Sequence, residues 1–92
     1  NPLDIDRIEL YYRQALEQAN ELKMRPLIAH CHLSLGELYT QMDQSGKAQQ
    51  ELLTATDFYR SMGMTAGLRE AEIALAKIAQ TVPSTSQTVV TH

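Results

Sequence analysis

Apolar residues recur at alternating intervals of three and four in four successive stretches of the chain. In order along the chain these positions are Ile5, Ile8, Tyr12, Ala15, Ala19 and Leu22; Ile28, Cys31, Leu35, Leu38 and Met42; Ala48, Leu52, Ala55, Tyr59 and Met62; and Leu68, Ala71, Leu75 and Ile78. Such spacing lines one face of an α-helix, and no stretch alternates like a β-strand. We therefore predict an all-α domain over residues 1–80, with helices at about 4–23, 26–42, 46–62 and 66–80.

Residues at the ends of these stretches suit helix boundaries. We expect N-terminal caps at Asp4, at Asp43 or Ser45, and at Thr65. Pro26 fits the first turn of a helix, where its missing N–H is not needed, and Gly63 can take the left-handed conformation that ends one. The links are short, which predicts antiparallel neighbours.

The chain also repeats itself after forty residues. Ala15 aligns with Ala55, Met24 with Met64 and Leu35 with Leu75, and similar residues pair elsewhere, as Leu33 does with Ile73. A helical repeat of this length cannot bury its apolar face alone and stacks on neighbours, as in solenoid proteins that hold other proteins. Because such arrays usually contain three or more repeats, we expect the chain to be part of a longer protein.

One segment resembles the tetratricopeptide repeat family in a longer-period form. His32, Leu35, Gly36 and Tyr39 have the spacing of its signature W-x2-L-G-x2-Y, with histidine in place of tryptophan. Ala48, Leu52 and Ala55 continue the pattern into the following helix. Small residues such as Gly36 and Ala48 allow helix backbones to approach closely.

The stretch 29–64 further resembles the C-terminal repeats of large bacterial signalling proteins, on the words AHCHLSLG and FYRSMGM. In those proteins a nucleotide-cyclase or other output domain is joined to an ATPase module and then to a tetratricopeptide array. The resemblance implies that any catalysis belongs to other domains of the parent protein.

Composition removes several classes of partner. The net charge of -3 and the absence of a Lys/Arg cluster argue against nucleic acid. No apolar run is long enough to cross a bilayer and no secretory signal is evident, so we expect no membrane partner. The lone Cys31 cannot form an internal disulfide, which favours a cytoplasmic protein. Residues 81–92, rich in Ser and Thr, are expected to form a flexible tail.

The sequence offers little evidence for a catalytic or metal-binding site. His30, Cys31 and His32 are potential zinc ligands, but neighbours on a helix point about 100° apart and His30 and His32 face nearly opposite sides. We expect Cys31 and His32 to pack instead. No glycine-rich phosphate loop occurs, and scattered Ser, His and Asp residues do not define a triad. The sequence therefore predicts neither an enzyme nor a cofactor.

A binding surface follows from the resemblance, because the first helix of each tetratricopeptide repeat lines the concave face. The residues so assigned are His30, Leu33, Glu37, Thr40, Gln41, Glu70, Ile73 and Lys77. The alternative is that all eight are solvated surface positions. Leu33 and Ile73 favour binding, since aliphatic side chains off the main stripe are unfavourable in water.

We therefore expect a protein-interaction or regulatory scaffold module that binds a peptide, another protein or a neighbouring domain of its parent on this face. The alternative is a structural cap that closes the repeat array and dimerises the parent, which implies a homodimer. The two differ in their response to Leu33→Glu or Ile73→Glu. A binding role predicts lost binding with folding spared, and a packing role predicts lost helicity.

Overall fold

The computed structural model describes residues 2–81, and the side chains of residues 4–80. This part of the chain contains four helices and no strand: α1 (Pro2–Glu21), α2 (Arg25–Gln41), α3 (Ser45–Met62) and α4 (Thr65–Thr81). The predicted all-α fold is confirmed, and each predicted helix is present. Thr81, predicted to begin the tail, is the last residue of α4, and the rest of the predicted tail lies outside the described residues. None of the described helices is long and apolar enough to cross a membrane.

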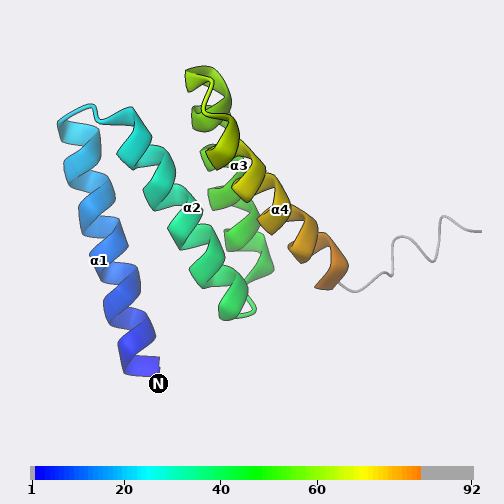
Figure 1. The fold of residues 1–92 in the computed structure, drawn as a ribbon. Coiled ribbons are helices and arrows are strands. Elements are labelled where there is room, and N and C mark those ends of the chain that lie inside the picture. Colours follow the sequence, from blue (N-terminus) through cyan, green and yellow to red (C-terminus); the bar gives the residue numbers. More distant parts are fainter. Residues whose placement is uncertain (1, 82–92) are drawn as a thin grey trace, which may run out of the picture.

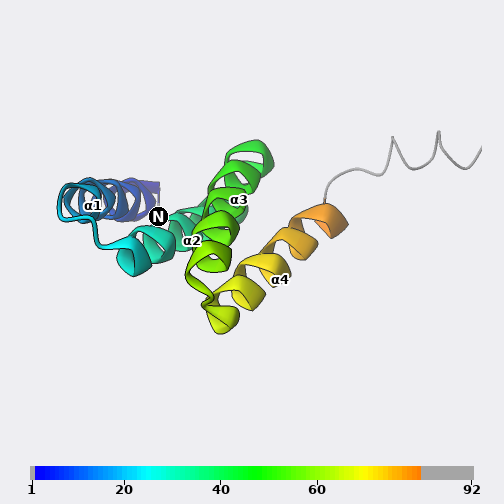
Figure 2. The same cartoon turned by 90° about the horizontal axis from the view of Figure 1, so that it is seen from above.

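The helices form an open antiparallel array with α1 at one end and α4 at the other (Figures 1 and 2). Each helix packs on the next in sequence, and α2 also touches α4, while α1 and α3 do not pack on each other. Among the described helices α2 therefore has the most neighbours, and α1 packs on α2 alone. This arrangement agrees with a helical repeat whose units are stacked side by side.

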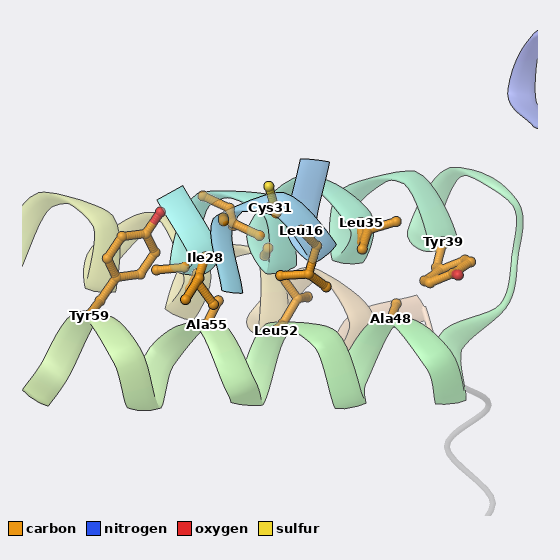
Figure 3. Packing of buried hydrophobic residues seen from close by; sticks show 14 of the residues in the cluster. Leu16, Ile28, Cys31, Leu35, Tyr39, Ala48, Leu52, Ala55 and Tyr59 are labelled. Carbon is orange, nitrogen blue, oxygen red and sulfur yellow. The ribbon is translucent and has the colours of Figure 1, made fainter. Parts of the chain in front are cut away.

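The core lies between α2 and α3 and extends to both neighbours. Figure 3 shows Ala48, Leu52, Ala55 and Tyr59 of α3 facing α2, with Leu16 of α1 close to the same cluster. The buried apolar residues of the described chain are Leu16, Ala19, Ile28, Ala29, Cys31, Leu33, Leu35, Leu38, Tyr39, Ala48, Leu52, Ala55, Tyr59, Ala71, Ala74 and Ile78. Most of these belong to the stripes read from the sequence, because one face of each helix must leave water.

Two glycines allow the helices to approach closely. A Cβ placed on Gly36 of α2 would fall 2.5 Å from side-chain atoms of Leu52 and 3.4 Å from the Ala48 carbonyl oxygen, both on α3. A Cβ on Gly67 of α4 would overlap the ring of Tyr59. The predicted close approach at Gly36 and Ala48 is confirmed, and Gly67 serves the α3–α4 contact in a similar way.

The predicted side-chain caps are wrong. Asp4 lies inside the first turn of α1, which begins at Pro2, and Ser45 and Thr65 are the first residues of α3 and α4. Asp43 has a left-handed backbone, and neither α2 nor α3 has a side-chain cap hydrogen bond. Pro26 does lie at the start of α2, as predicted.

Three equivalent backbone turns end α1, α2 and α3. Lys23, Asp43 and Gly63 have positive φ values of 56°, 58° and 69°. After each, the next N–H donates to a carbonyl five residues back, at 2.9 Å in every turn: Met24 to Ala19, Gln44 to Tyr39 and Met64 to Tyr59. This closure satisfies a backbone carbonyl at the C-terminal end of each helix without a side chain. The predicted left-handed Gly63 is confirmed, while the other two turns use residues that rarely adopt this conformation.

Candidate functional site

An open groove lies between α2 and α4. It has a volume of about 340 Å³ and is lined by Glu37, Thr40, Gln41, Ala74 and Lys77. Four of these are among the residues predicted to form the binding face. Ala74 was not predicted, although its position between Glu70 and Lys77 at helical spacing places it on the same side of α4. Both walls of the groove are held in place by α3, on which α2 and α4 each pack.

The other predicted residues lie outside this lining. His30 and Glu70 are exposed, and Ile73 is 51% exposed on α4. Leu33 is only 4% exposed and belongs to the core cluster. The surface position expected for Leu33 is therefore wrong, because two further helices pack after α2 and bury its far side. Leu33→Glu would place a charge in the core and unfold the protein, so it cannot report on binding.

The groove carries opposite charges on its two walls. Glu37 comes from α2 and Lys77 from α4, and both side chains are exposed. The Thr40 hydroxyl donates to the Gly36 carbonyl oxygen at 2.8 Å, which fixes its direction and leaves its oxygen able to accept. A bound segment would therefore meet a carboxylate, an ammonium group and a fixed hydroxyl.

Negative charge also gathers near Tyr59 of α3. Burial raises the pKa of the Tyr59 phenol, and the negative charges of Glu70 and Glu37 add to the rise. Tyr59 therefore stays neutral under ordinary conditions while the two carboxylates remain close to it. Within the groove itself Glu37 supplies the negative charge and Lys77 the positive charge.

A second polar cluster, unforeseen in the sequence, joins α1, α2 and α3. Arg13 donates to the Tyr39 hydroxyl at 2.7 Å and forms an ion pair with Glu51 at 3.2 Å, while Tyr39 donates to Glu9. Burial and the hydrogen bond to Glu9 raise the pKa of Tyr39, against the opposing effect of Arg13. The Lys47 ammonium lies 5.5 Å from the centre of the Tyr39 ring. Tyr39 is thus a polar junction as well as a core residue.

His32 belongs to the same cluster. Its Nδ1 lies 2.7 Å from Glu51 Oε1 and, since a carboxylate only accepts, this nitrogen donates. Its ring stacks on Phe58 with centroids 6.1 Å apart. Cys31 is buried, and burial raises the pKa of its thiol. The predicted packing of both residues is confirmed. No group of His, Cys, Asp and Glu side chains within the described residues is arranged to hold a metal ion.

Comparisons with known proteins add no relative. No family model, no curated protein and no solved structure matches the chain. The resemblance to tetratricopeptide repeats and to bacterial signalling proteins therefore stays a prediction, and the function proposed for the chain depends on the geometry of the groove.

Proposed function

We propose that this chain is a tetratricopeptide-like interaction module of a larger cytoplasmic signalling protein of bacterial type. It binds a peptide, or a segment of a neighbouring domain, in the groove between α2 and α4. The observation that carries the proposal is the convergence of Glu37, Thr40, Gln41 and Lys77 from two helices on one open groove. In this function the module recognises and positions its bound segment, and catalysis belongs to other domains.

The charges of the groove suggest the chemistry of its ligand. A segment with a basic side chain directed to Glu37 and Glu70, and an acidic one directed to Lys77, would match the charges in both places. Such pairs at a rim contribute mainly to specificity and to the rate of association. The small Ala74 between them leaves room for an apolar side chain of the ligand.

Selection from a random peptide library, followed by fluorescence titration of the recovered peptides, tests this proposal. We expect peptides that combine basic and acidic residues, and we expect Glu37→Lys to weaken their binding by about tenfold or more. Charge reversal at the exposed Glu17 of α1 is the matched control and should leave binding unchanged. If no peptide is enriched, or if Glu37→Lys and Glu17→Lys behave alike, the groove is not the binding site.

A further inference from the structure

The forty-residue repeat aligns each inner helix of the array with an outer helix that has an open face. It aligns α1 with α3 and α2 with α4, so the packed pair α2–α3 is a template for what should cover the outer faces of α1 and α4. In that pair Gly36 of α2 lies against Leu52 and Ala48 of α3. Polar groups flank this contact, with His32 paired to Glu51, and Arg25 donating to Ser61 at 2.6 Å.

The α1 side of this template is apolar and open. Ile8 aligns with the buried Ala48, but Ile8 is 43% exposed. Tyr11 and Leu22, which align with the partly buried Glu51 and Met62, are 66% and 69% exposed. On the helix these residues form one stripe beside the stripe that packs on α2. In the described structure α1 therefore lacks the neighbour that α2 provides for α3.

The α4 side of the template is open as well. Ile73 aligns with Leu33, which is buried in α2, whereas Ile73 is 51% exposed. Ala76 aligns with Gly36 and keeps a small residue at the centre of the contact, yet it too is exposed. Within residues 2–81 no helix follows α4, which explains the difference between the two aligned positions.

We propose that a second copy of the chain packs its α4 on the outer face of α1, as α2 packs on α3. The open face of α4 corresponds to the α2 side of the α2–α3 contact, and the open face of α1 corresponds to its α3 side. The aligned polar pairs also match, because Glu72 would accept from the Tyr11 hydroxyl where His32 meets Glu51. Thr65 would likewise donate to Glu21 where Arg25 meets Ser61.

This contact is heterologous, so it joins copies head to tail and does not close after two. Ile8 and Ala76 are larger than the aligned Ala48 and Gly36, so the two helices stand farther apart than α2 and α3. One helix pair buries little surface, and we expect weak, concentration-dependent association. The groove between α2 and α4 is not part of either face, so this inference is independent of the proposed ligand site.

Sedimentation velocity of the full chain, from micromolar to millimolar concentration, tests the proposal with two blocking variants. Tyr11→Glu blocks the α1 face and leaves α4 open, and Ala76→Glu does the reverse. Both positions are exposed, so circular dichroism should show unchanged helicity. We expect the natural chain to associate, each variant alone to associate about tenfold or more weakly, and an equimolar mixture of the two to form a dimer.

Leu10→Glu is the matched control, because Leu10 is exposed on another side of α1 and should leave association unchanged. Three results would each overturn the proposal. A natural chain that is monomeric throughout shows that the faces do not bind each other. A blocked variant that associates alone shows a symmetric contact between like faces. A mixture that stays monomeric shows that α1 and α4 are not partners.

Discussion

Single residues set how closely the helices pack. Gly36 and Gly67 lie where any side chain would collide with Leu52 or Tyr59, and both of those residues are buried and cannot move into solvent. Gly46, at the start of α3, has open space where a Cβ would lie, with no neighbouring atom within 4 Å. The three helical glycines therefore differ in whether their missing side chain matters.

Gly36→Ala should destabilise the protein by about 1–3 kcal/mol, since the overlap with Leu52 outweighs the better helix propensity of alanine. Gly46→Ala should be neutral or stabilising by up to about 1 kcal/mol, because only propensity changes there. Urea unfolding followed by circular dichroism measures both. Equal effects of the two substitutions would mean that the α2–α3 contact at Gly36 is not tight.

At the scale of the elements, a cluster of polar side chains connects two helices that do not pack on each other. Helices α1 and α3 do not pack on each other, yet Arg13 of α1 reaches Glu51 of α3, and Glu51 also accepts from His32 of α2. Glu51 is mostly buried, while Arg13 is partly exposed. The carboxylate therefore links three helices at a place where solvent screens it only in part.

Glu51→Gln keeps the size of the side chain and removes its charge. We expect a loss of about 1–2 kcal/mol, because the ion pair with Arg13 and the charge-assisted hydrogen bond from His32 are both weakened. Asp57→Asn is the control, since its 3.6 Å pair with Arg60 is exposed and should contribute little. Thermal unfolding of the two variants side by side would contradict this view if Asp57→Asn were the more harmful.

At the scale of the whole molecule, the array is covered unevenly. Helices α2 and α3 have neighbours on more than one side, whereas α1 packs only on α2 among the described helices. The stability of such an array is the sum of the stability of each repeat and of each contact between neighbouring repeats. The end helices therefore open before the inner ones.

Hydrogen exchange read by mass spectrometry should follow this order in dilute protein. The slowest amides are expected in α2 and α3 around Leu35 and Leu52, and the fastest helical ones in the first turns of α1, since fewer contacts hold them. Association of copies should slow exchange in α1 and α4 as concentration rises. Uniform protection across all four helices would show that the protein opens only as a whole.

The sequence alone was sufficient for the helices and for most of the core, because an amphipathic helix must direct its apolar stripe inward whatever it packs against. It also located the close contact at Gly36, since a small residue on a core-facing stripe has few other uses. The cap predictions at Asp4, Ser45 and Thr65 failed because each residue lies inside the first turn of its helix and not before it. The backbone bonds to Ala19, Tyr39 and Tyr59 close the other, C-terminal ends of α1, α2 and α3.

Tertiary structure decided what periodicity cannot express, namely how many neighbours each helix has. Leu33 and Ile73 occupy the same place in the repeat, yet one is buried and the other exposed, because two helices follow α2 and none follows α4 in the described chain. The groove and the Arg13–Glu51–His32 cluster arise in the same way, from residues far apart in sequence that only packing brings together. A local pattern determines which face of a helix is apolar, while the arrangement of the other helices determines whether water reaches it.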